Sequence, residues 1–114
     1  MLVWAPKSKA ELQAAIVECL KLSTDCSNGP HGPIGSWDVS SVNDMESLFN
    51  KDAIPGADKF NGDISTWDVS SVVTMDLMFH ESQLFNGDLS KWDVSKVTSM
   101  FGVFHSAKSF NADL

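Results

Sequence analysis

Two stretches of this 114-residue chain are nearly identical: FNGDISTWDVSSV occupies residues 60–72, and FNGDLSKWDVSKV occupies residues 85–97. The second begins 25 residues after the first, as Phe85 follows Phe60. Such a repeat either carries the same site twice or builds the same structural unit twice. The register extends along most of the chain, at the following positions: Trp37, Trp67 and Trp92; Met45, Met75 and Met100; Phe60, Phe85 and Phe110.

This register divides residues 31–114 into three units, 31–60, 61–85 and 86–110, followed by the first residues of a fourth. The first unit is five residues longer than the others, and the excess falls in KDAIPGADK at 51–59. Proline and glycine within this stretch are typical of a surface loop. The repeats therefore predict a single array, interrupted by one loop.

Each unit reads as two short elements. Trp67 and Val69 alternate with polar residues, which is the pattern of a strand with one buried face. Val72, Met75 and Phe79 then fall on one face of about two helical turns. An isolated helix shorter than ~12 residues is marginal in water, so neither element is stable unless units stack. The pattern predicts an α/β solenoid of one short strand and one short helix per repeat of ~25 residues.

Residues 1–30 lie outside the register and contain a different pattern. Ser8 is followed three positions later by Glu11, which is the capping-box arrangement at the start of a helix. An apolar stripe follows, formed by Leu12, Ala15, Ile16, Cys19 and Leu20. We expect an N-terminal helix that caps the array, and then a linker rich in Ser, Asn, Gly and Pro.

The composition excludes several classes of function. The formal net charge is −7, and all eight basic residues are lysines. An acidic chain without arginine lacks the bidentate donor that reads phosphate and guanine, so nucleic acid is not an expected partner. No apolar run approaches the ~20 residues of a membrane-spanning helix, and no transmembrane segment is expected. The first residues, MLVWAPKSK, lack the apolar core of a signal peptide.

The motifs W-D-V-S-x-V-x-x-M and F-N-x-D-[IL] over residues 31–114 resemble the 25-residue repeat of mycoplasma-type surface lipoproteins. The same repeat occurs in surface proteins described as leucine-rich-repeat-like, a domain of unknown function. The resemblance implies an extracellular or cell-surface location, a solenoid fold, and a part in adhesion or protein binding. It implies neither an enzyme nor a cofactor. His31 and Pro33 depart from the pattern, where later units have Asn and Asp.

Asp38, Asp68 and Asp93 lie between the Trp and Val of each unit and are predicted to point outward. Like charges on neighbouring strands repel, so these residues need an explanation. Each Asp either accepts N–H groups near the start of the following helix, or contributes to an acidic strip that attracts a lysine-rich partner or Ca²⁺. No EF-hand loop is present, which weakens the calcium alternative.

Asn61, Asn86 and Asn111 recur at a turn in every unit. We expect them to form a structural ladder, in which each amide satisfies backbone groups of its own and the next turn. The alternative is a ladder of ligand-binding side chains.

Two further pairs have a structural and a functional interpretation. Cys19 and Cys26 are either two reduced thiols or a short disulfide, and the resemblance to surface proteins favours the disulfide. His80 and His105 occupy equivalent positions, but no third ligand is evident from the sequence. We therefore expect a surface pair and no metal site.

These observations together predict a non-enzymatic repeat module that binds a protein partner, basic in character, on a surface or secreted protein. A carbohydrate-binding surface module and a purely structural spacer are the alternatives.

Overall fold

The computed structural model describes residues 3–107, and its first regular element is the helix α1, Lys9–Leu22. The Ser8 side chain accepts a hydrogen bond from the Glu11 N–H (3.2 Å), and the Glu11 carboxylate accepts one from the Lys7 N–H (3.2 Å). The first bond satisfies a donor that the first turn of a helix leaves free, and the second fixes the residue that precedes the cap. The buried face consists of Leu12, Ala15, Ile16 and Cys19. The predicted N-terminal helix is confirmed.

The part of the chain that follows α1 contains little regular secondary structure. Two short 3-10 helices are present, η1 (Ile34–Ser36) and η2 (Ala57–Lys59), and the described residues include no strand. Isolated parallel bridges join Asp44 to Thr74 and Thr74 to Ser99. The predicted α/β alternation of one short strand and one short helix per repeat is therefore wrong for the residues that the structure describes.

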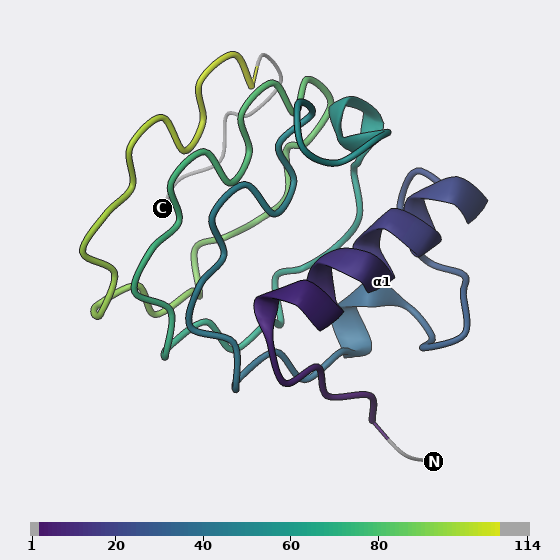
Figure 1. Ribbon diagram of the computed structural model, residues 1–114, viewed down its shortest axis with the longest axis horizontal. Coiled ribbons are helices and arrows are strands. Elements are labelled where there is room, and N and C mark those ends of the chain that lie inside the picture. Colours follow the sequence, from purple (N-terminus) through teal and green to yellow (C-terminus); the bar gives the residue numbers. More distant parts are fainter. Residues whose placement is uncertain (1–2, 108–114) are drawn as a thin grey trace.

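Backbone hydrogen bonds join segments that occupy the same register in successive units. Alternate N–H groups of residues 45–51 donate to carbonyls of residues 74–80, with N···O distances of 2.8–3.1 Å. Alternate N–H groups of residues 75–81 donate in the same way to carbonyls of residues 99–105, at 2.8–2.9 Å. In Figure 1 these segments run side by side, at increasing distance from α1. The backbone of each unit is thus held by that of the next.

Successive turns replace the helix that the apolar spacing predicts. The Met78 N–H donates to the Met75 carbonyl (3.1 Å) and the His80 N–H to the Leu77 carbonyl (3.2 Å), three residues back rather than four. Leu77 has a φ of +57°, whereas helical residues have φ near −60°. The equivalent residues Ser47 and Gly102 also have positive φ, +59° and +60°.

The physical reason lies in the backbone groups. A helix of two turns leaves most of its N–H and C=O groups without partners at its two ends. In the chain of turns, one N–H of each successive pair bonds within the turn and the other bonds to the neighbouring unit. This arrangement keeps the apolar residues on one side and satisfies more of the backbone than a short helix can.

The predicted strand is interrupted by a turn, although its pattern of burial is confirmed. Trp67 and Val69 are 3% and 1% exposed, and Asp68 between them is exposed. The chain then bends, because the Val72 N–H donates to the Val69 carbonyl (3.0 Å). Asp68 also accepts a hydrogen bond from the Ser70 N–H (3.0 Å), and such local bonds compete with the pairing of strands. The alternation is therefore too short to form a ladder.

Phenylalanine side chains stack through the middle of the molecule. The rings of Phe49 and Phe79 are parallel with centroids 5.5 Å apart, and Phe104 continues the stack at 5.5 Å from Phe79. A second pair, Phe60 and Phe85, lies 5.8 Å apart. The two sets touch, since the centroids of Phe49 and Phe60 are 4.4 Å apart. Stacked aromatic pairs stabilise a core beyond the apolar area that they bury.

Tryptophan side chains link each unit to the one before it. The Trp67 indole Nε1 donates to the Ile34 carbonyl (2.8 Å), and the Trp92 Nε1 donates to the Ile64 carbonyl (3.0 Å). Ile34 and Ile64 occupy equivalent positions in the first and second units. A buried indole N–H needs an acceptor, so each Trp packs where that carbonyl is available.

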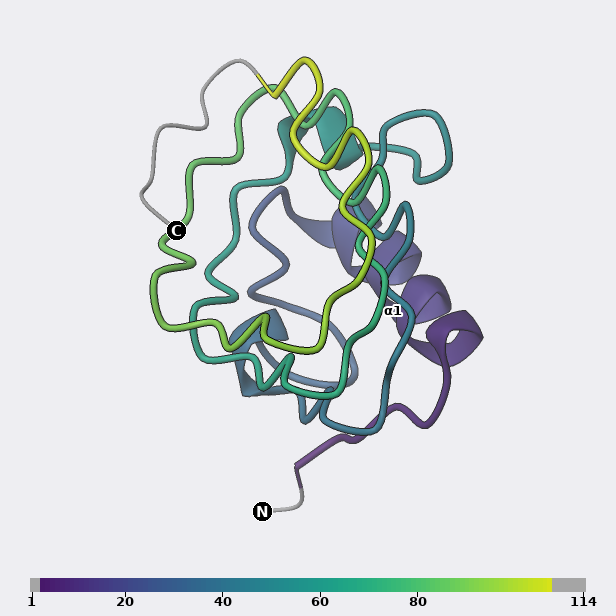
Figure 2. The same cartoon turned by 90° about the vertical axis from the view of Figure 1, so that its left-hand side faces the viewer.

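The whole is a compact globule with α1 along one side. Its radius of gyration is 12.7 Å, close to the ~13 Å expected for a folded chain of this length. Figure 2 shows successive stretches of the chain tracing loops of similar outline. Among the described helices, none is both long and apolar enough to cross a membrane.

Candidate binding site

The aspartates between Trp and Val are held by the serine two residues later. The Ser70 N–H (3.0 Å) and Ser70 hydroxyl (2.6 Å) both donate to Asp68 Oδ1, and Ser40 makes the same two bonds to Asp38, at 3.0 and 2.6 Å. Asp93 accepts the Ser95 N–H at 3.0 Å. Each Asp therefore does accept local N–H groups, but those of a turn, because no helix follows.

These bonds favour the charged form of the three carboxylates. The hydroxyl of the following serine, and then its N–H, lower the pKa of Asp38, Asp68 and Asp93 below the usual range. Asp68 raises the pKa of Asp38 and Asp93 raises that of Asp68, so neighbouring carboxylates interact through space. All three are exposed. We call Asp38, Asp68 and Asp93 the acidic strip.

A second set of aspartates repeats this geometry in the Phe-Asn-Gly-Asp turns. Asp63 accepts the Ser65 N–H (3.0 Å) and hydroxyl (2.7 Å), and Asp88 accepts the Ser90 N–H (2.9 Å). The serine bonds lower the pKa of both aspartates, while the charge of Asp88 raises that of Asp63. A pair with the same chemistry as the acidic strip thus lies elsewhere on the surface.

The asparagine column is exposed to solvent where the structure describes it. Asn61 and Asn86 both lie at the surface, and Asn111 lies outside the described residues. The Asn61 N–H donates to the Thr24 carbonyl (3.1 Å), which ties this turn to the linker that follows α1. The turn passes close to that linker, since a Cβ on Gly62 would lie 2.4 Å from the Asp25 carbonyl oxygen. A glycine is therefore required beside Asn61.

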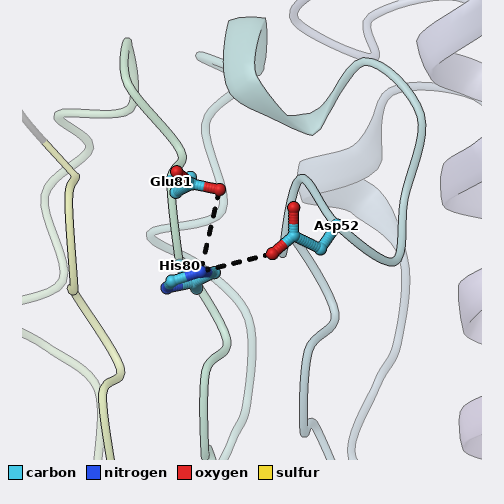
Figure 3. Close-up of side chains that lie close together, drawn as sticks. All are labelled: Asp52, His80 and Glu81. Carbon is cyan, nitrogen blue, oxygen red and sulfur yellow. Dashed lines mark ion pairs between the residues drawn. The ribbon is translucent and has the colours of Figure 1, made fainter.

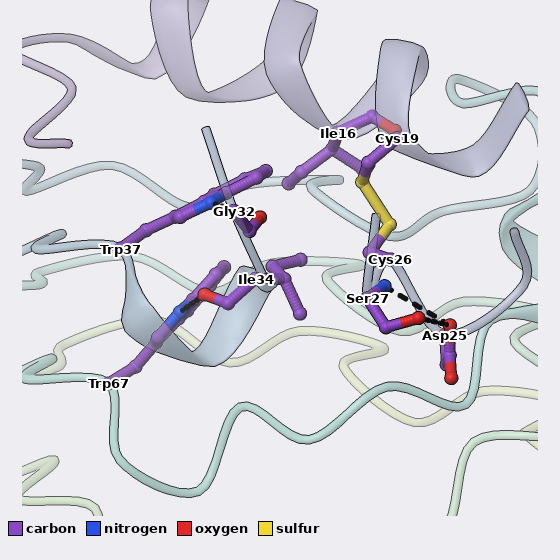
Figure 4. The surroundings of a disulfide bond; sticks show 9 residues. All are labelled: Ile16, Cys19, Asp25, Cys26, Ser27, Gly32, Ile34, Trp37 and Trp67. Atoms are coloured by element: carbon purple, nitrogen blue, oxygen red, sulfur yellow. Dashed lines mark hydrogen bonds between the residues drawn. A yellow bond between two sulfur atoms is a disulfide. The ribbon is translucent and has the colours of Figure 1, made fainter. Parts of the chain in front are cut away.

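Cys19 and Cys26 form a disulfide in the structure, with an S–S distance of 2.06 Å. Both residues are buried, at 2% and 0% exposure, and the bond fastens α1 to the linker (Figure 4). The Ile34 N–H donates to the Cys26 carbonyl (2.9 Å), so the linker is also fixed to the first unit. Through these contacts α1 is held against the repeats.

His80 lies in a cluster that the sequence did not predict. His80 and His105 stack, with ring centroids 4.9 Å apart and the two Nδ1 atoms separated by 3.1 Å. On the other edge of the His80 ring, Nε2 lies 3.4 Å from Asp52 Oδ2 and 3.7 Å from Glu81 Oε2 (Figure 3). The histidine pair was expected, whereas the two carboxylates were not. Asp52 comes from the loop of the first unit, whose path the sequence pattern does not fix.

A cavity of about 270 Å³ lies between α1 and the start of the first unit. The Trp4 ring stacks on His31 with centroids 3.8 Å apart, and Trp37 meets Trp4 edge to face at 5.1 Å. Carboxylate side chains from α1, Glu11 and Glu18, also line the cavity. Aromatic walls with a few polar groups are characteristic of small-molecule sites.

The comparison with known families found one match. The model of the family described as "Mycoplasma protein of unknown function, DUF285" matches residues 18–114, which include the end of α1 and all the repeat units. The resemblance inferred from the repeat motifs is thereby confirmed. Comparisons with curated proteins and with solved structures found no match.

Proposed function

Because this chain belongs to the DUF285 family, whose description assigns no function, we propose a function from its own residues. We propose that it is a non-enzymatic repeat module that binds a protein partner on a surface or secreted protein. The carboxylates of the acidic strip support a binding role rather than a catalytic one. The hydrogen bonds from the following serines lower their pKa and favour the charged form, which is the form that a basic partner would recognise.

We also propose that residues 31–114 form a solenoid, built from turns in place of strand and helix. The backbone hydrogen bonds between equivalent segments support this proposal, as does the stack of Phe49, Phe79 and Phe104. Each contact joins residues one unit apart, which is the pattern of nearest-neighbour interactions in a repeat array. A solenoid presents equivalent side chains in columns, and the acidic strip is one such column.

The observation that carries the proposed function is the acidic strip itself. The three exposed carboxylates come from three units; the charge of Asp68 disfavours the charged form of Asp38, and the charge of Asp93 disfavours that of Asp68. A partner with lysine or arginine side chains at matching intervals would relieve this repulsion. The net charge of −7 would also speed the encounter with a basic partner. A basic protein segment is therefore the proposed occupant.

The experiment compares two variants with equal loss of charge. In one, Asp38 and Asp68 are changed to Asn; in the other, Asp63 and Asp88 are changed to Asn. Asparagine can still accept the serine N–H, so both variants should retain their turns. The probe is an immobilised lysine-rich peptide, and binding is measured by surface plasmon resonance at low and at physiological salt.

We expect the strip variant to weaken binding by about tenfold or more, and the control variant by much less. Equal weakening by both variants would show that only net charge matters, which contradicts a role of the acidic strip. Unchanged binding by both would leave the structural spacer as the better description.

The proposed location is extracellular or at the cell surface. The disulfide between Cys19 and Cys26 supports it, because disulfides persist in oxidising compartments and are rare in the cytosol.

A carbohydrate-binding module is the second candidate, and the cavity beside α1 favours it. Trp4 and His31 supply stacked aromatic rings, and Glu11 and Glu18 supply hydrogen-bond acceptors for hydroxyl groups. A glycan array probed with the intact chain tests this candidate. Binding that is lost in Trp4→Ala but retained in the strip variant would favour it over the basic partner.

A further inference from the structure

The five-residue extension of the first unit brings Asp52 next to two residues of the second unit, His80 and Glu81. Ligand atoms of all three residues lie within 4.8 Å of one another. Figure 3 shows both carboxylates directed at the same edge of the His80 ring, which is the edge that carries Nε2. The His80 side chain is 17% exposed and is therefore fixed by its surroundings, while Asp52 and Glu81 remain open to solvent. The cluster is thus preorganised around His80 but accessible.

The charges of this cluster do not balance. Among the described residues, the ion pairs of Asp52 and Glu81 are made with His80 alone, and no lysine joins them. Two carboxylates beside one neutral imidazole leave two negative charges, and even a protonated imidazole leaves one. A divalent cation would neutralise the pair completely.

We propose that Asp52, His80 and Glu81 bind a divalent transition-metal ion of the zinc type. One imidazole nitrogen and two carboxylate oxygens are a donor set that Zn²⁺ accepts, with bonds of ~2.0–2.2 Å. Tetrahedral ligands at that distance lie about 3.3–3.6 Å from one another. The 3.4 Å separation between His80 Nε2 and Asp52 Oδ2 lies within this range, whereas the 3.7 Å separation to Glu81 Oε2 is slightly longer, so Glu81 would move closer to bind the ion. Water completes the coordination on the exposed side.

His105 serves as a positioning residue for this site. A metal on Nε2 requires the proton of neutral His80 to lie on Nδ1, and Nδ1 is 3.1 Å from His105 Nδ1. With its own proton on Nε2, His105 accepts this bond. Partners that accept the second N–H of a ligating histidine fix its tautomer and its orientation. The stacked pair therefore selects the nitrogen that faces Asp52 and Glu81.

The test measures binding of Zn²⁺ by isothermal titration calorimetry at neutral pH, with the chain free of any affinity tag. We expect one ion per chain, and at least about tenfold weaker binding in Asp52→Asn and in Glu81→Gln. His80→Asn, which introduces the residue found at the equivalent Asn50, should abolish the one-site isotherm. Asp58→Asn is the matched control, because it removes the same charge from the same loop, and it should bind as the original chain does.

The positioning role of His105 has its own readout. His105→Ala should weaken Zn²⁺ binding by about tenfold. His105→Gln should restore most of it, because the amide oxygen can accept the Nδ1–H bond. Nitrogen chemical shifts of His80 should show the Nδ1–H tautomer in the original chain and a mixture of tautomers in His105→Ala.

Two results would overturn the proposal. One is the absence of one-site binding in the original chain. The other is equal binding in Asp52→Asn, Glu81→Gln and the Asp58→Asn control, with all of them folded by circular dichroism. The cluster would then be an ion pair without a metal function. Because the acidic strip shares no residue with this cluster, neither result bears on the proposed binding of a basic partner.

Discussion

At the scale of the residue, the Asp-x-Ser sequence forms a turn that exposes the aspartate carboxylate and directs the middle side chain inward. In Asp68-Val69-Ser70, the aspartate accepts two bonds from the serine, and the valine between them is 1% exposed. Three consecutive residues thereby place a carboxylate outside and an apolar side chain inside. The same sequence occurs at the following positions: Asp25–Ser27, Asp38–Ser40, Asp63–Ser65, Asp88–Ser90 and Asp93–Ser95.

These turns predict a loss of stability in acid. The serine bonds lower the pKa of all six aspartates in the folded chain, so the unfolded chain binds more protons at low pH. Their contribution is complete above the unfolded pKa of about 3.9 and is lost as the pH falls through the lower folded values. The midpoint of thermal unfolding should therefore decrease steadily below about pH 4.

The control for this prediction replaces Asp63 and Asp88 by Asn. The variant should show a flatter dependence of the unfolding midpoint on pH in the acid range, because two titrating groups have been removed. An unchanged slope would mean that these hydrogen bonds do not persist in solution.

Side-chain burial was predictable from the sequence, but the carboxylates around His80 were not. Alternation placed Trp67 and Val69 inside, and both are buried, because the direction of a side chain depends on its immediate neighbours. The approach of Asp52 to His80 depends on how a loop folds against another unit, which no local pattern records.

At the scale of the element, local signals predicted α1 and failed for the second half of each unit. The capping residues and apolar stripe of α1 all lie within its own sequence. Residues 72–79 have an equally good apolar stripe, but many of their backbone partners belong to the preceding and the following units. Apolar spacing alone cannot distinguish a two-turn helix from a chain of turns.

Gly102 provides a test of turn against helix. Its φ is +60°, where L-residues carry a penalty of about 1–2 kcal/mol, and a Cβ there would lie 2.8 Å from Leu77 Cδ2. Gly102→Ala should therefore lower the free energy of unfolding by about 1–2 kcal/mol, measured by denaturant titration. In a helix the same substitution would raise it by about 1 kcal/mol, so the sign decides between the two structures.

Ser106→Gly is the converse variant. Ser106 is exposed and has a φ of +60°, so glycine at this position relieves the same backbone penalty. We expect unchanged or slightly increased stability. A marked decrease would indicate that the turn geometry does not hold at this position.

At the scale of the whole molecule, the disulfide fastens α1 to the linker that leads into the first unit. Cys19 lies on the buried face of α1, and Cys26 lies in the linker. The carbonyl of Thr24, two residues before Cys26, accepts the Asn61 N–H. Short covalent and hydrogen-bonded links thus connect the helix, the linker and the second unit. The sequence located both cysteines, but the choice between thiols and a disulfide rested on the resemblance to surface proteins.

Replacing Cys19 and Cys26 by Ser should lower the free energy of unfolding by roughly 2–3 kcal/mol, the contribution of a loop this short on the chain-entropy model. Denaturant unfolding with and without dithiothreitol measures it. The reductant should lower the free energy of unfolding of the original chain and leave that of the double variant unchanged. A reductant effect of equal size in both proteins would contradict the assignment.

The hydrogen bonds between units also align the dipoles of many peptide groups. At alternate residues they run from the N–H of the earlier unit to the carbonyl of the later one, with Val73 and Thr98 donating in the opposite sense. Peptide dipoles of ~3.5 D therefore add along the array, whereas those of an ordinary sheet largely cancel. The carbonyl end lies toward the first unit, where Lys9 Nζ approaches Asp44 and Glu46 at 3.8 and 3.9 Å. The aligned peptide groups therefore place partial negative charge toward the first unit, beside α1, and partial positive charge toward the third unit.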